Sequence, residues 1–192
     1  MLVFLVLASV NAQNLLKNGS FENPIDPQGS SGTTNWTVVY AYGGPADFAY
    51  ADRTTEACKP DDPTYPGGSW GAAFRANHAE YMHAYHKQVV TNLTLGASYT
   101  LSGYMHRFSD LAQVRIYIET YGGADGTSLA TITNATTTRT KYFLTNSASA
   151  SGQLEIRLGF QIKPEIADWN SEDPKFPRSA GYFDVFSLTP TP

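Results

Sequence analysis

The feature that most constrains this chain is a strict alternation of apolar and polar residues, which recurs throughout its second half. From Leu154 to Phe160 every second residue is apolar, and the stretches 99–106 and 113–119 show the same period of two. Successive side chains of a β-strand point to opposite faces, so this period indicates strands with one face in the core and the other in solvent. A chain with several such strands is predicted to fold as layered sheets.

Further strands are predicted wherever short runs rich in β-branched and aromatic residues lie between turn signals such as Asn18-Gly19 and Gly122-Gly123. About ten strands with irregular loops predict an all-β fold, a two-sheet antiparallel β-sandwich. The length of 192 residues fits a single domain, placed at 13–192. The further strands are predicted at 15–21, 36–42, 71–75, 83–90, 128–133, 138–144 and 182–188, and long loops at 24–34, 46–69 and 163–180.

The charge of the chain argues against nucleic acid as a partner. Lys and Arg number 13 against 17 Asp and Glu, which gives a net charge of −4. Phosphate binding needs clustered basic residues, and the sequence contains no such cluster.

The N-terminal residues 1–12 have the composition of a secretory leader. Leu2–Val10 is an apolar run, and Val10-Asn11-Ala12 resembles a small-x-small cleavage site before Gln13. We therefore predict a signal peptide at 1–12 and a secreted, extracellular protein. The alternative is an apolar strand that is retained and buried by a neighbouring subunit. A membrane anchor is disfavoured, because a span needs about 20 apolar residues.

Four Asn-x-Ser/Thr sequons, none with Pro in the middle, support export and predict N-glycosylation. They begin at Asn18, Asn35, Asn92 and Asn134, although the first also has the Asn-Gly sequence of a structural turn. The single cysteine, Cys58, has no partner for an internal disulfide. In an oxidising compartment it is expected to be buried or joined to another chain.

Three segments at matching spacing resemble the superfamily of carbohydrate-binding modules with galactose-binding-like jelly rolls. Residues 14–22 (NLLKNGSFE) are similar to the opening motif of such modules, 92–102 (NLTLGASYTLS) to their mid-domain turn and strand, and 182–188 (YFDVFSL) to their closing strand. The resemblance brackets nearly the whole of 13–192. It implies the jelly-roll fold and, as a tendency of the class, sugar binding without catalysis.

The resemblance also implies a structural calcium ion, held by acidic side chains near the first and last strands. In this sequence the matching residues are Glu22 and Asp184, whose hard oxygen atoms suit calcium. The position at which the family has a second aspartate is Val185 here. The alternative is that both carboxylates hydrogen-bond the backbone near the strand ends.

Sugar recognition needs aromatic planes that stack on the C–H face of the ring, with charged or amide groups reaching its hydroxyls. The solvent sides of the predicted central strands carry both kinds of residue. If those strands are neighbours in one sheet, they form one concave binding surface. The alternative is an ordinary exposed face with cross-strand Tyr/Arg packing. The candidates are Tyr104, His106, Arg115, Tyr117, Glu119 and Arg157.

Two other groups of residues are weaker candidates. Trp169, in an acidic and Pro-rich loop, is predicted to contact a partner, either glycan or protein. His78, His83 and His86, with Glu80, hint at a metal, but their spacing matches no closed zinc pattern. We interpret them as strand or turn residues.

No familiar catalytic motif occurs in the sequence. It has no Gly-x-Ser-x-Gly elbow, no His-Glu-x-x-His and no phosphate-binding Gly loop. We therefore predict a secreted, non-catalytic glycoprotein module that binds glycan. The alternative is a self-assembling extracellular structural subunit of a fibril or coat, with Cys58, the long loops and the apolar segment 1–12 supplying the subunit contacts.

Overall fold

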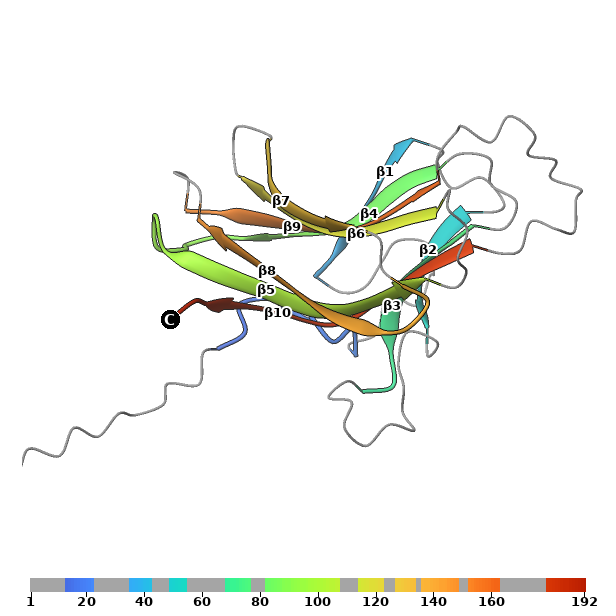
Figure 1. The fold of residues 1–192 in the computed structure, drawn as a ribbon, viewed down its shortest axis with the longest axis horizontal. Helices are drawn as coiled ribbons and strands as arrows, with labels where there is room; N and C mark the ends of the chain where they lie inside the picture. Colours follow the sequence, from blue (N-terminus) through green and yellow to red (C-terminus); the bar gives the residue numbers. More distant parts are fainter. Residues whose placement is uncertain are drawn as a thin grey trace, which may run out of the picture.

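A computed structural model describes residues 13–22, 35–42, 49–54, 68–76, 82–107, 114–122, 127–133, 136–148, 152–162 and 179–192. In these parts of the chain, ten strands form two five-stranded antiparallel sheets (Figure 1). The same residues include no helix that is long and apolar enough to cross a membrane. Sheet A has the order β1 (Thr37–Tyr42), β4 (Met82–Val90), β9 (Leu154–Ile162), β6 (Val114–Gly122), β7 (Thr127–Thr133), and sheet B has the order β2 (Ala49–Thr54), β3 (Gly71–Ala76), β10 (Ser179–Pro190), β5 (Ser98–Arg107), β8 (Thr140–Ser147).

The two sheets enclose a common core, which confirms the predicted all-β jelly-roll sandwich. Along β9, Leu154 and Phe160 and the apolar residues between them at every second position are fully buried, whereas Glu155 and Arg157 are partly exposed. β5 alternates in the same way. Burying a large apolar side chain contributes about 1.5–3 kcal/mol, so the pattern that predicts the strands is also the one that holds the sheets together.

Two details of the predicted strand map are wrong. Residues 15–21, predicted to be a strand, form turns instead, although Leu16 and Phe21 still reach the core. β2 lies inside the stretch 46–69, which was predicted to be a long loop. In both places tertiary contacts decide the conformation. β2, for example, is stabilised by pairing with β3 along its whole length.

The turn segment 13–22 packs along the closing strand β10, and Asn14 holds it there. The Asn14 side-chain oxygen accepts hydrogen bonds from the backbone N–H groups of Leu16 and Leu188, both at 3.0 Å, and its Nδ2 donates to the Phe186 carbonyl at 3.1 Å. The Phe186 N–H donates to the Gly19 carbonyl at 2.8 Å, and a Cβ at position 19 would overlap the Phe186 carbonyl oxygen. The glycine of the opening motif is therefore required by close backbone packing.

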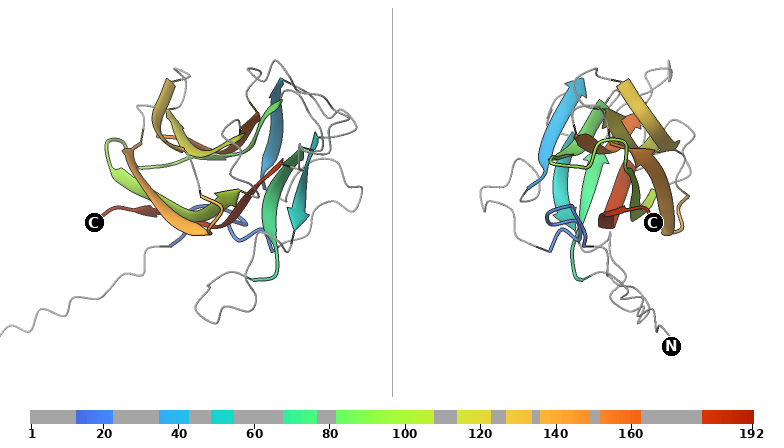
Figure 2. Two further views of the ribbon diagram at one scale, coloured as in Figure 1. Left: turned by 45° about the vertical axis from the view of Figure 1, so that its right-hand side comes forward. Right: turned by 90° about the vertical axis from the view of Figure 1, so that its left-hand side faces the viewer.

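Sheet A is curved, so that its outer face is concave. Figure 2 (left) shows the sheet as a trough, with β7 rising on one side and β1 on the other, and with sheet B beneath. Side chains that point outward from the central strands therefore converge on one another, which is the arrangement a binding surface needs.

Candidate functional site

Three adjacent central strands of sheet A bring aromatic and charged side chains together on its outer side. β9 lies between β4 and β6, and the register places Gly159 between Tyr85 and Tyr117. Two residues away on β9, Arg157 lies between Lys87 and Glu119. We call this set the concave face, and it comprises His83, Tyr85, Lys87, Arg115, Tyr117, Glu119, Tyr121, Glu155, Arg157 and Gln161.

The structure divides the sequence-predicted sugar-binding residues between two surfaces. Tyr104 and His106 are on β5, which lies between β10 and β8 in sheet B, on the opposite side of the sandwich. The predicted binding surface required all the candidate strands to be neighbours in one sheet, and β5 does not meet this condition. Trp169 lies outside the described residues. The candidates that do share the concave face are Arg115, Tyr117, Glu119 and Arg157.

Tyr117 forms the floor of the concave face. Its ring lies over Gly159, so that a Cβ at position 159 would overlap the ring, and the side chain is only 5% exposed. The Tyr117 hydroxyl is 2.8 Å from Nε2 of His83 on β4, so the two residues are joined across β9. Burial, followed by the charge of Arg115, lowers the pKa of His83, while burial raises the pKa of Tyr117. At neutral pH both groups are therefore uncharged, and each can exchange hydrogen bonds.

Arg157 is the centre of a charged network on the same face. Its guanidinium lies 3.5 Å from the Tyr121 ring centroid and 4.8 Å from that of Tyr85. Its Nε donates to Oε1 of Glu155 at 2.6 Å, and a guanidinium nitrogen is 3.6 Å from Oε2 of Glu119. The Arg157 side chain is 19% exposed. The carboxylates and tyrosines thus hold the guanidinium in one position before any ligand arrives.

Several members of the concave face were missed as sugar-binding candidates in the sequence. Tyr121 continues the Arg115–Tyr117–Glu119 alternation by one further step, and Glu155 precedes Arg157 by two residues. Extending each alternation to the end of its strand would have found both. Tyr85 shares the outer side of β4 with His83 and not with the buried His86, so β4 places these two histidines of the suspected metal cluster on opposite sides, while His78 and Glu80 lie outside the described residues.

The outer side of sheet B carries a different set of side chains, which range from the buried Tyr182 to the exposed Phe143. Lys141 of β8 lies 5.8 Å from the Tyr104 ring centroid and 5.2 Å from that of Phe143. His106 stacks on Tyr182 with the ring centroids 4.7 Å apart. Phe143 is 60% exposed. We call Tyr104, His106, Lys141, Phe143 and Tyr182 the flat face, as a label for the outer side of sheet B and not as a description of its shape.

Glu22 and Asp184, the predicted calcium ligands, both accept backbone hydrogen bonds. Oε1 of Glu22 accepts from the Trp70 N–H at 2.8 Å, and Oδ1 of the buried Asp184 accepts from the Val185 N–H at 2.7 Å. In the described part of the chain, no three His, Cys, Asp or Glu side chains gather as a metal site. Two carboxylates suit calcium only if backbone oxygens complete the shell, so the calcium ion remains a prediction.

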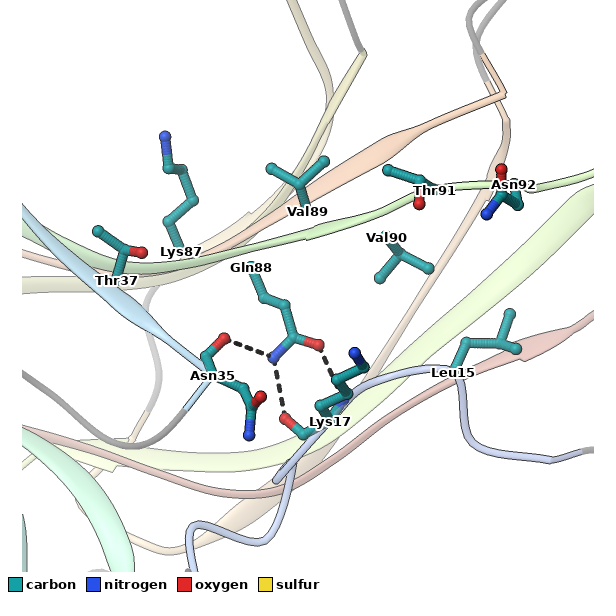
Figure 3. A pocket seen from close by; sticks show the side chains of 10 residues that line it. All are labelled: Leu15, Lys17, Asn35, Thr37, Lys87, Gln88, Val89, Val90, Thr91 and Asn92. Atoms are coloured by element: carbon teal, nitrogen blue, oxygen red, sulfur yellow. Dashed lines mark hydrogen bonds between the residues drawn. The ribbon is translucent and has the colours of Figure 1, made fainter. Parts of the chain in front are cut away.

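A cleft of about 570 Å³ lies at the edge of β4, beside the N-terminal segment (Figure 3). Its wall is built around Gln88, which donates to the carbonyls of Lys17 at 2.9 Å and Asn35 at 3.1 Å and accepts from the Lys17 N–H at 2.8 Å. The sequon residues Asn35 and Asn92 both line this cleft and are exposed, whereas Asn18 is half-buried. Asn134 lies outside the described residues, and glycosylation remains a prediction at all four sequons.

The sequence matches no protein-family model and no curated protein. Its fold matches solved structures at low identity. A family 61 carbohydrate-binding module in complex with β-1,4-galactotriose is 16% identical, with a TM-score of 0.59 over 94% of this chain and 100% of that one. A family 22 xylan-binding domain from Paenibacillus barcinonensis is 16% identical, with a TM-score of 0.50 over 93% and 95%.

An enzyme also contains this fold. The enzymatically active domain of tailspike protein 4 from bacteriophage CBA120 is 14% identical, with a TM-score of 0.56 over 93% of this chain but 21% of that one. Together these similarities show that the chain has a jelly-roll fold like that of these carbohydrate-binding modules.

Proposed function

We propose that this protein is a secreted, non-catalytic glycan-binding module and that it binds its ligand on the concave face. The observation that carries the proposal is the half-buried network in which Arg157 lies between Tyr85 and Tyr121 and is held by Glu119 and Glu155. The same contacts also stabilise the sheet, and in addition they hold aromatic rings beside charged groups on one outer surface.

The chemistry of this network suits a sugar ring. Partly exposed tyrosine rings offer the apolar plane on which sugar C–H groups stack, and the arginine and glutamate groups can donate to and accept from hydroxyls. Because contacts within the network already fix its side chains, little conformational entropy is lost when a glycan binds. Tyr117 supports this arrangement from below by its bond to His83.

The similar structures support the same class of ligand. One of them holds β-1,4-galactotriose and another is a xylan-binding domain. Each matches almost the whole of this chain, so the likeness extends to the sheet that carries the concave face.

The test compares ring removal on the two outer surfaces. We expect Tyr85→Ala and Tyr121→Ala each to weaken glycan binding by about tenfold or more, because each removes a stacking surface. Phe143→Ala on the flat face is the matched control, and it should bind like the unmodified protein. Affinity gel electrophoresis against a panel of plant, algal and animal polysaccharides measures the retention, and circular dichroism checks the fold. The proposal fails if Phe143→Ala or Tyr104→Ala abolishes retention while Tyr85→Ala and Tyr121→Ala leave it unchanged.

One observation favours the second candidate function, the self-assembling structural subunit. Among the described residues, β8 is an edge strand of sheet B and carries the exposed Phe143. The backbone N–H and C=O groups of an edge strand can pair with another chain, and an exposed apolar side chain adds to that contact. Sedimentation velocity and electron microscopy of the native protein test this function. Ordered filaments that are lost in Phe143→Lys would support assembly, and monomers at all concentrations would exclude it.

A further inference from the structure

We infer that the glycan bound by the concave face is acidic, carrying carboxylate or sulfate groups, and that Arg115 receives one of them. This inference rests on the proposed function. The concave face has three cationic side chains, Lys87, Arg115 and Arg157, against the two carboxylates Glu119 and Glu155. The difference of three and two gives this face a net charge of +1, in a chain whose net charge is −4. Its charge is therefore opposite to that of the protein as a whole.

The cations of the concave face are neutralised unequally. Arg157 contacts both carboxylates, and Lys87 is 3.7 Å from Oε2 of Glu155. Across the residues that the structure describes, no carboxylate makes an ion pair with Arg115. The Arg115 guanidinium instead lies 5.4 Å from the centroid of the Tyr117 ring, and its Nε is buried without a hydrogen-bond partner.

The surroundings of Arg115 match an anion better than a neutral hydroxyl. Its register partner on β9 is Gln161, and the register partner of Gln161 on β4 is His83. Among the described residues, this end of the face thus carries a guanidinium, an amide and an imidazole and no carboxylate. A guanidinium donates two parallel hydrogen bonds to a carboxylate or sulfate group, and charged hydrogen bonds of this kind are about twice as strong as neutral ones.

The experiment uses pairs of polymers that share a backbone and differ in charge. Polygalacturonate is compared with its fully methyl-esterified form, and a sulfated galactan with a neutral one, by affinity gel electrophoresis and isothermal titration calorimetry. We expect the acidic member of at least one pair to bind about tenfold more tightly, and its binding to weaken with added salt.

Arg115→Gln should remove this preference, so that the acidic and the neutral member of each pair bind with the same affinity to within about twofold. Arg115→Lys, which keeps the charge without the planar fork, should give an intermediate preference. Lys141→Gln makes the same change of charge on the flat face and should have no effect.

The outcomes separate this inference from the proposed function. Equal or tighter binding of the neutral member would overturn the acidic ligand while leaving glycan binding in place. A preference for acid that persists in Arg115→Gln, with the fold intact by circular dichroism, would overturn the role of Arg115. Failure of every polymer to bind would refute the proposed function itself, and this inference with it.

Discussion

The concave face and the flat face are built from the same kinds of residue, yet the structure treats them differently. Each carries tyrosine rings beside a basic side chain. On the concave face Arg157 contacts two tyrosines and two carboxylates and is 19% exposed. On the flat face Phe143 is 60% exposed, and Lys141 has two rings beside it but no ion pair among the described residues.

The difference teaches that residue type alone does not make a site on this sandwich. The curvature of sheet A brings outward side chains into contact with one another (Figure 2), and the glycine at the centre of the face makes room for a ring. Neighbours that hold a charged group in one position make it a better ligand group than an exposed one, because its ordering has already taken place in the free protein. Both outer faces are carried by strands whose other side lies in the common core. The two faces can therefore be compared only under conditions in which that core is stable.

The largest predicted effect is a loss of stability of that core at low pH, which limits the pH range in which the two faces can be compared. His86 points inward from β4, and its ring centroid is 4.4 Å from that of Phe74. Burial lowers its pKa to about 4. Neither ring nitrogen makes a hydrogen bond of ordinary geometry, and the nearby backbone of Ala73 offsets only part of the effect of burial.

The sign of the pH effect follows from this shift. The unfolded chain takes up the His86 proton near pH 6.5, well before the folded protein does, so stability is complete above pH 6.5 and falls as the pH drops toward 4. We expect a loss of about 3 kcal/mol over this range. In His86→Leu the loss should be clearly smaller. Urea unfolding of both proteins between pH 7 and pH 4 measures it, and parallel curves would refute the role of His86.

The second prediction breaks the concave face at its centre. Gly159→Ala places a methyl group where the Tyr117 ring lies, so it should lower the free energy of unfolding by about 2 kcal/mol and abolish glycan retention. Adding Tyr117→Ala to the same protein removes the overlap. The double variant should regain part of its stability without regaining binding. Denaturant titration and gel retention measure the two effects, and a Gly159→Ala protein that retains both properties would contradict the arrangement.

The third prediction sharpens the comparison by removing one cation from each face. Arg157→Leu leaves Glu119 and Glu155 without their shared partner, so it should destabilise the fold by about 1–2 kcal/mol and weaken binding. Lys141→Leu on the flat face should change the unfolding free energy by less than about 0.5 kcal/mol. Thermal and denaturant unfolding measure the difference. Equal effects of the two substitutions would show that the faces do not differ as described.

The sequence predicted the fold more fully than it predicted the candidate site, for a physical reason. Alternation fixes which residues share a face within one strand. It therefore predicted that Arg115 and Tyr117 share a face and that Leu154 points inward. Alternation says nothing about which sheet a strand joins. β5 pairs with β10 from the far end of the chain, and β6 pairs with β9, so long-range pairing alone separates Tyr104 from Tyr117.

The central claim, that glycan binds on the concave face, is tested most directly by mapping the ligand on the unmodified protein. Amide correlation spectra of isotope-labelled protein are recorded during titration with an oligosaccharide from the best-retained polymer. We predict that the largest shifts occur at Gly159, Tyr117 and their neighbours on β4, β6 and β9, while the amides of β5 and β8 stay in place. Shifts concentrated at Tyr104, Phe143 and the rest of the flat face would contradict the account.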